Sequence, residues 1–160
     1  MNLEKHKLQA TALKKENKVF YDKLQRTKPK QLDNNFHKMH DEAFEKIDCL
    51  ACANCCKTTS PIFYNRDIEK LAKHLKQKPG SFIETYLRID EDKDYVLKQA
   101  PCPFLGADNY CSVYEARPTA CREYPHTDRK RMEQILTITY NNTFVCPAVL
   151  EITEKLKKIL

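Results

Sequence analysis

The chain has 160 residues, about the length of one domain, and can bury a hydrophobic core without covalent cross-links. Its net charge of +6 is confined to residues 1–30, where nine Lys or Arg residues stand against three acids. Because the N-terminus is charged throughout and no segment approaches the roughly 20 apolar residues of a membrane span, we expect a soluble cytoplasmic protein without membrane association.

The basic N-terminal stretch raises the question of nucleic-acid binding. Such a stretch can bind phosphates without sequence specificity. No aromatic-rich platform for single strands and no DNA-reading motif accompanies it. We therefore expect the solvated face of a Lys-rich helix rather than a nucleic-acid interface.

The spacing of apolar residues predicts mainly helical structure. In chain order we expect a helical segment ending near Pro29, a helix from Phe36 to Ile47 leading into Cys49, a helix over residues 65–75, a short helix opened by a capping box from Ser81 to Glu84, a β-hairpin around residues 90–94, an irregular segment over residues 100–125, a strand at residues 134–141, and a closing helix from Pro147. The predicted fold class is mainly α with short β-hairpin elements, as a small irregular metal-stabilised domain with cysteine ligands from both halves of the chain. We assign residues 1–30 to a basic helical extension and residues 31–160 to the cysteine-cluster domain.

The alternating acids of the stretch RIDEDKDYVLK suggest a calcium loop at first sight. An EF-hand loop beginning at Asp90 requires Gly at position 95 and Glu at position 101. Tyr95 and Pro101 stand there instead. The turn of a β-hairpin is the better interpretation.

The cysteines carry the strongest chemical signal. An even number of cysteines in a reducing cytosol indicates metal or redox chemistry rather than a disulfide framework. The candidate metal ligands are Cys49, Cys52, Cys55, Cys56, Cys102, Cys111, Cys121 and Cys146. The first three follow a C-x2-C-x2-C spacing, which lets successive thiolates converge on one centre in zinc and iron–sulfur sites alike. Because neighbouring side chains diverge, Cys55 and Cys56 are expected to serve different centres, or one of them bridges two metals.

Part of this pattern is similar to the ligand run of bacterial ferredoxins, in which C-x2-C-x2-C precedes a cysteine followed by proline. Cys102 and Cys146 are each followed by proline here. The ferredoxin position of the fourth cysteine, four residues after the third, is occupied by Thr59. The spacing alone therefore leaves zinc and iron–sulfur ligation open.

The stretches CLACANCC, PCPFL and NYCSVYEARPTACREYP, together with the later Cys-Pro, resemble the YkgJ-type CxxCxxCC cysteine-cluster family of zinc- or iron-chelating domains. The resemblance covers roughly residues 45–150. It implies metal chelation by Cys49 to Cys121 of the set above, and Cys146 fits a longer version of the pattern. Many members have glycine after the second cysteine, where this chain has Ala53, so the resemblance also implies an unusual backbone angle there.

Three other side chains are candidates near the cysteines. His126 closes the last cysteine-bearing segment, either as a further ligand or as a capping or surface histidine. His40 shares the apolar face of its predicted helix, which favours a packed histidine over a carboxylate-assisted iron site. Arg117 can donate hydrogen bonds to thiolate sulfur or pair with a carboxylate, or else lie at the surface.

Three functions remain open at this level. The first is a zinc-stabilised module that presents a surface to a protein partner. The second is an iron–sulfur or multinuclear iron protein with electron-transfer or oxidoreductase activity, and the third is thiol redox chemistry at C-x2-C. We favour metal binding, with zinc ahead of an iron–sulfur cluster, because the third function leaves most cysteines unexplained. The sequence does not define a substrate, a reaction or a partner.

Overall fold

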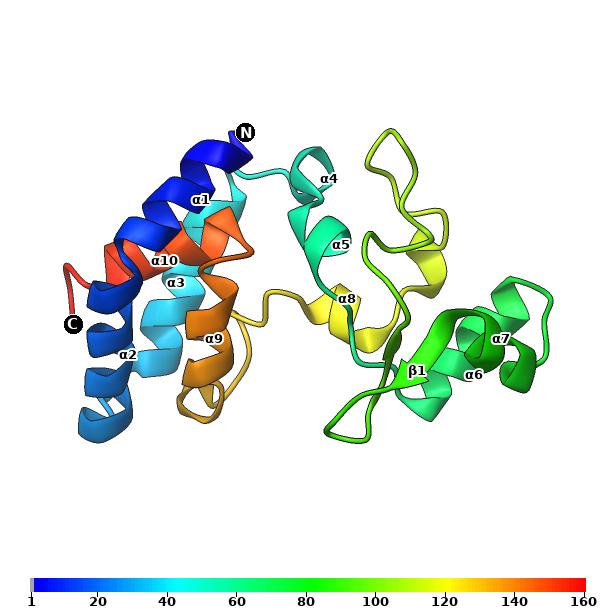
Figure 1. Ribbon diagram of the computed structural model, residues 1–160. Helices are drawn as coiled ribbons and strands as arrows, with labels where there is room; N and C mark the ends of the chain where they lie inside the picture. Colours follow the sequence, from blue (N-terminus) through cyan, green and yellow to red (C-terminus); the bar gives the residue numbers. More distant parts are fainter. Residues whose placement is uncertain (1) are drawn as a thin grey trace. The chain divides into compact units, whose positions relative to one another are not determined.

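Helices make up most of the structure, a computed structural model that describes residues 2–160 (Figure 1). Two units are distinguished, one formed by the chain up to Cys52 together with Pro125–Leu160, and the other by Ala53–Tyr124. We call them unit 1 and unit 2. The mainly helical prediction is confirmed, and the one sheet found among residues 2–160 has two strands. No helix in the described part of the chain is long and apolar enough to span a membrane.

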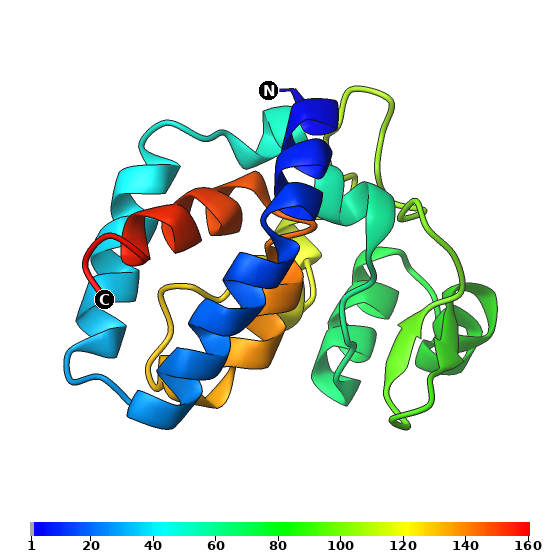
Figure 2. The same ribbon diagram turned by 60° about the vertical axis from the view of Figure 1, so that its left-hand side comes forward.

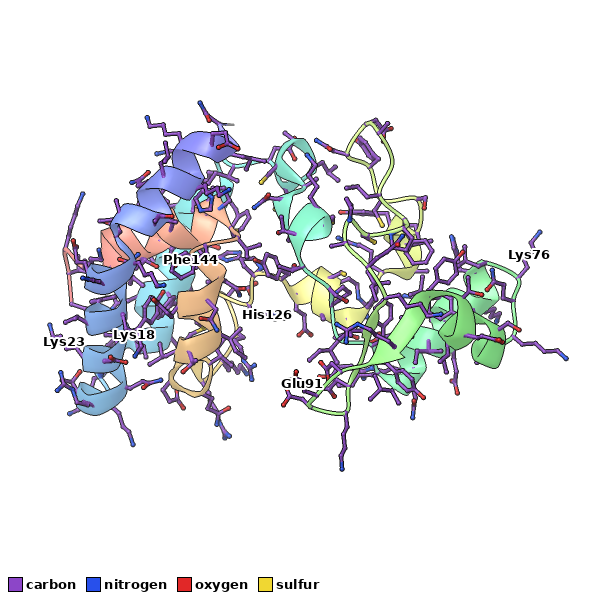
Figure 3. All side chains as sticks on the ribbon, viewed as in Figure 1. Lys18, Lys23, Lys76, Glu91, His126 and Phe144 are labelled. Carbon is purple, nitrogen blue, oxygen red and sulfur yellow. The ribbon has the colours of Figure 1, made fainter. Side chains whose placement is uncertain are left out.

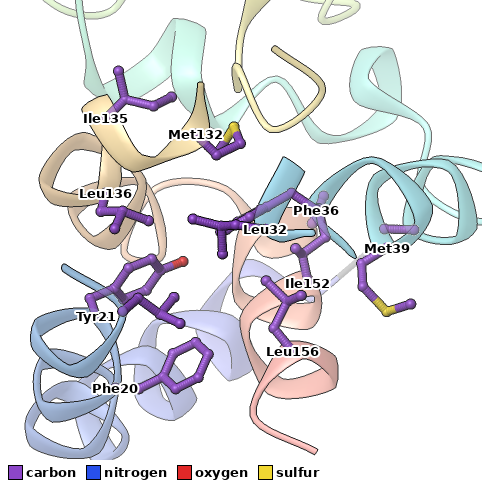
Figure 4. Close-up of a cluster of buried hydrophobic side chains, with 13 residues drawn as sticks. Phe20, Tyr21, Leu32, Phe36, Met39, Met132, Ile135, Leu136, Ile152 and Leu156 are labelled. Carbon is purple, nitrogen blue, oxygen red and sulfur yellow. The ribbon is translucent and has the colours of Figure 1, made fainter. Parts of the chain in front are cut away.

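Unit 1 is a helical assembly around one core. Its elements are α1 (Leu3–Ala12), α2 (Lys14–Thr27), α3 (Leu32–Phe44), α4 (Cys49–Cys52), the 3-10 helix η2 (Met132–Gln134), α9 (Leu136–Asn142) and α10 (Pro147–Leu156). Figure 4 shows the core side chains converging from these helices, with Phe36, Ile152 and Leu156 fully buried. The helices predicted before Cys49 and from Pro147 are confirmed as α3 and α10, and these two pack against each other.

The basic N-terminal segment consists of two consecutive helices with a bend between them (Figure 2). They are separated at Leu13, and α2 ends at Thr27, followed by Lys28, which adopts a left-handed conformation before Pro29. The apolar side of α2 contributes Tyr21 and Leu24 to the core of unit 1, while its lysines face solvent. The division of the chain at residue 30 stays a prediction.

The strand predicted at residues 134–141 is wrong, because this stretch forms the end of η2 and most of α9. Its β-branched residues favour a strand locally. In the structure Leu136 and Thr139 are buried on one side of a helix that packs on α2, and the Thr139 hydroxyl donates a hydrogen bond to the Ile135 carbonyl. Burial of this helical face outweighs the local preference.

Unit 2 combines small helices with the β-hairpin. Its elements are α5 (Asn54–Thr58), α6 (Asn65–His74), α7 (Pro79–Tyr86), β1 (Leu87–Ile89), β2 (Tyr95–Leu97), the 3-10 helix η1 (Tyr114–Ala116) and α8 (Thr119–Glu123). Helices α6 and α7 pack together, and their apolar faces join β1, β2 and Phe104 in a second core. The predicted capping box at Ser81 is wrong: α7 begins two residues earlier, with Pro79 at its first position.

The predicted hairpin is confirmed, with Leu87 opposite Leu97 and Ile89 opposite Tyr95. Asp90, one of the alternating acids, has a structural role in the turn of this hairpin. Its carboxylate accepts hydrogen bonds from the backbone N–H groups of Asp92 and Asp94, both at 2.9 Å. This carboxylate therefore stabilises a turn.

Candidate metal centre

The segment CLACANCC forms two short helical turns that break at Ala53. Asp48 begins the first turn, because its carboxylate accepts a hydrogen bond from the Leu50 N–H at 2.9 Å. Ala53 has φ of 48°, in the left-handed region, as the resemblance implied for this position. The break lies where the two units divide: Cys49 and Cys52 belong to unit 1, and Cys55 and Cys56 to unit 2.

In unit 2 a folded loop brings Cys102 and Cys111 near Cys56. The Cys102 N–H donates a hydrogen bond of 2.8 Å to the Cys56 carbonyl. Cys111 forms an antiparallel bridge with Leu105, which closes the loop. The loop turns at Gly106, where an added Cβ would lie only 2.7 Å from the Asp108 carboxylate. Two cysteines nine positions apart are thus held on one short loop.

Cys121 comes to this group on α8, which is fixed by Asp67 of α6. The Asp67 carboxylate is almost fully buried and accepts hydrogen bonds from the Thr119 N–H and hydroxyl, each at 3.0 Å. Its other oxygen accepts from the Tyr64 N–H at 3.0 Å, so the same side chain caps α6. Sequence reasoning missed this residue. An acid in the first turn signals a cap, but its partner 52 positions later is brought to it only by the fold.

Arg117 lies beside the cysteines of unit 2 in a defined orientation. Its guanidinium carbon is 3.6 Å from the centre of the Tyr114 ring, and its Nε donates a hydrogen bond of 2.9 Å to the Tyr114 carbonyl. Burial raises the pKa values of Cys111 and Cys121, and the positive charge of Arg117 opposes this; it also contributes to the lowered pKa of Cys56, whose main cause is a hydrogen bond with Cys55. The arginine therefore favours negative charge on these sulfurs, and its predicted hydrogen bonds to thiolate sulfur or to a carboxylate stay a prediction.

The pKa values show that four thiols of unit 2 influence one another. Burial is the largest cause that raises the pKa of Cys121 to about 12, and negative charge on Cys56, Cys102 and Cys111 raises it further. Burial likewise raises the pKa values of Cys102 and Cys111, again with a contribution from Cys56. A hydrogen bond from Cys55 lowers the pKa of Cys56 to about 7, against burial and with help from Arg117. Cys56 is therefore the thiol that ionises first in this group.

A second set of thiols lies in unit 1. Burial is the main cause that raises the pKa of Cys146 to about 11, the N–H groups of Val149 and Ala148 lower it, and negative charge on Cys49 and Cys52 raises it. Cys146 is the N-cap residue of α10 and is half-buried against the core of unit 1, whereas Cys49 is exposed. The eight cysteines are thus divided between the two units, and none within residues 2–160 is in a disulfide.

The histidine candidates lie in unit 1 and make protein contacts. His40 Nδ1 is 2.8 Å from the buried Thr127 hydroxyl, and its ring lies 4.5 Å from that of Phe44. These are the contacts of a packed histidine. His126 is half-buried on the segment between α8 and η2, where its backbone is left-handed with φ of 65° (Figure 3). Its role as a ligand stays a prediction.

The donor set in unit 2 suits a soft, positively charged ion. Thiolates are the preferred protein ligands of zinc and of iron–sulfur clusters, and thiols that raise each other's pKa are stabilised in the ionised form by a shared cation. Over residues 2–160 no three or more His, Cys, Asp or Glu side chains lie close enough together to hold a metal ion. The residue types and the influence of the thiols on one another's pKa values fit a metal.

Comparison with known proteins agrees with this chemistry. The family model CxxCxxCC, described as "Putative zinc- or iron-chelating domain", matches residues 48–146. The chain belongs to this family. The matched range begins one residue before Cys49 and ends at Cys146, so it contains all eight cysteines. No curated protein and no solved structure matches the chain.

Proposed function

We propose that the protein binds zinc in unit 2 through the thiolates of Cys56, Cys102, Cys111 and Cys121. One observation carries the proposal: the four cysteines come from α5, from one loop and from α8, the Cys102 N–H is hydrogen-bonded to the Cys56 carbonyl, and negative charge on Cys56, Cys102 and Cys111 adds to the burial that raises the pKa of Cys121. Four thiolates complete the tetrahedral ligand set of a structural zinc ion. The positive charge of zinc offsets the repulsion between four neighbouring thiolates.

The residues of this site have separate tasks. The loop that bridges Leu105 to Cys111 sets the positions of two sulfurs, and Asp67 holds the helix that carries Cys121. Arg117 offsets negative charge that remains after four thiolates meet a divalent ion. Such a centre fixes the irregular segment of residues 100–125, which has little regular secondary structure of its own. We propose that this stabilised surface of unit 2 binds a protein partner in the cytoplasm.

An iron–sulfur protein with electron-transfer or oxidoreductase activity is the second candidate. The observation that favours it is the C-x2-C-x2-C run with a Cys-Pro pair at Cys146, a combination found in iron–sulfur proteins. Thiolate ligation alone does not distinguish the two metals, since both accept four cysteines.

Anaerobic purification followed by metal analysis and a visible spectrum separates these candidates. A colourless protein that contains zinc supports the proposal, and a brown protein with matching iron and acid-labile sulfide overturns it in favour of the second. Cys121→Ser should lose the metal of unit 2. Ser112→Ala, which alters an exposed side chain next to Cys111, is the matched control and should keep it. Retention of full metal content by Cys121→Ser contradicts the assignment of this ligand.

A further inference from the structure

Two runs of basic residues that are distant in the chain meet at one end of unit 1. The first is the end of α2 with the turn that follows it, and the second lies just before η2. Together they form what we call the basic patch, with the side chains of Arg26, Lys28, Lys30, Arg129, Lys130 and Arg131. The first run alone is expected to be a solvated helix face, and the fold adds the second run beside it.

Helix α3 holds the second run next to the first. The carboxylate of Asp33, three residues after Lys30, accepts hydrogen bonds from the Arg131 N–H at 2.7 Å and from the following N–H at 2.9 Å. One turn along the same helix, His37 Nε2 donates a hydrogen bond of 2.8 Å to the Arg129 carbonyl. The two runs accordingly lie at the same end of unit 1 (Figure 1 and Figure 2). These bonds use backbone groups of the second run, so its charged side chains stay available to solvent.

The positive charge of the basic patch is not neutralised by neighbouring acids. All six side chains are exposed, and none of them forms an ion pair within residues 2–160. The same two segments contain three acids. Asp33 is occupied by the backbone N–H groups, and Asp128 lies 3.9 Å from His40 Nε2. Glu133 is exposed. Six cations against three acids leave a surplus of three positive charges in one place.

The surroundings of the basic patch indicate which anion it fits. The large apolar side chains that are exposed in the described part of unit 1 are aliphatic, and none belongs to these two segments. Protein partners are usually anchored by aromatic or other large apolar side chains, and membrane surfaces by apolar side chains that insert between lipids. Stacking of unpaired bases likewise requires aromatic rings. Contact with the phosphates of a duplex requires only cations.

We infer that the basic patch binds the phosphate backbone of a double-stranded nucleic acid, without reading its sequence. The arginines can bind one phosphate through two nitrogens, and the lysines contact phosphates as point charges. The surface exists only in the folded chain, because α3 joins its two halves. The inference does not rest on the proposed function, since the zinc site is assigned to unit 2 and the basic patch belongs to unit 1.

Fluorescence anisotropy of the full chain with a labelled DNA duplex tests the inference. With about four to six phosphate contacts, the affinity should fall by roughly 100- to 2,000-fold between about 50 and 200 mM salt. Lys30→Glu and Lys130→Glu alter one run each. Each should weaken binding and reduce the slope of log K against log salt concentration by about one. Lys73→Glu, on an exposed position of α6, changes the net charge equally and should bind like the wild type.

The contrary results are equally specific. A loss of affinity in Lys73→Glu equal to that in Lys30→Glu would show an effect of net charge alone and overturn the basic patch. Failure to bind the duplex at low salt overturns the inference, as does tighter binding of polyglutamate or of vesicles containing phosphatidylserine. Circular dichroism checks that each variant is folded. If a glutamate variant unfolds, Lys30→Gln and Lys130→Gln take its place, and wild-type affinity in both would equally refute the inference.

Discussion

Replacement of Asp67 by alanine is the sharpest test of how unit 2 holds its cysteines. The carboxylate is 3% exposed and accepts three hydrogen bonds, from Thr119 twice and from Tyr64 once. A hydrogen bond to a charged group contributes about 1.5–3 kcal/mol, and such contributions are not additive within one network. We expect Asp67→Ala to lower the free energy of unfolding of unit 2 by about 3–5 kcal/mol.

The same change should weaken metal binding, because α8 carries Cys121 and loses its attachment to α6. If about 1.4–2.8 kcal/mol of the cost falls on ordering α8 before binding, zinc affinity falls by roughly 10- to 100-fold. Asp67→Asn keeps an oxygen acceptor and should have a smaller effect on both quantities.

Urea unfolding followed by circular dichroism gives the stability, and competition with a coloured zinc chelator gives the affinity. Glu69→Ala, an exposed change on the same helix, is the matched control. Asp67→Ala with the stability and zinc affinity of Glu69→Ala would refute the argument that this carboxylate positions α8.

Three further predictions concern protonation, backbone conformation and the core. The pKa of Cys56 is about 7 and that of Cys121 about 12, and the pKa values of Cys102 and Cys111 are raised, so the four zinc-free thiols of unit 2 hold about four protons at pH 6 and about three at pH 8. Zinc binding releases these protons, and zinc affinity therefore rises with pH. Calorimetry in buffers of different ionisation enthalpy should count the protons released. Ala53→Gly should raise the free energy of unfolding by about 0.5–1 kcal/mol in urea, because relief of the left-handed strain exceeds the entropy that glycine adds to the unfolded chain. Asn17→Leu should raise the free energy of unfolding by about 1–2 kcal/mol and the melting temperature by a few degrees, because the buried amide of Asn17 has no hydrogen-bond partner within residues 2–160.

Each of these has a clear contrary result. Zinc affinity that is equal at pH 6 and pH 8 would mean that thiols are not the ligands. A lower stability for Ala53→Gly would show that the lost methyl group matters more than the strain. A melting temperature that falls in Asn17→Leu would reveal a buried water or another partner of the amide.

Periodicity predicted the long amphipathic helices correctly and the short elements less well. The helix before Cys49 and the one from Pro147 were readable because their apolar residues recur at helical spacing and are buried by a core. The helix within residues 134–141 could not be predicted in this way, because its β-branched residues favour a strand locally. Only the burial of Leu136 and Thr139 on the side that packs on α2 makes the stretch helical. Short segments take their conformation from the surface on which they pack.

The sequence by itself determined the chemistry: eight cysteines at this spacing, with no set of residues for another reaction, indicate thiolate–metal binding, and the family match agrees. Only the tertiary structure decided which thiols are neighbours. Cys56, Cys102, Cys111 and Cys121 gather in unit 2, and Cys49, Cys52 and Cys146 in unit 1. Spacing limits what nearby residues can do together, but the meeting of cysteines up to 97 positions apart depends on the packing of the helices and loops that carry them.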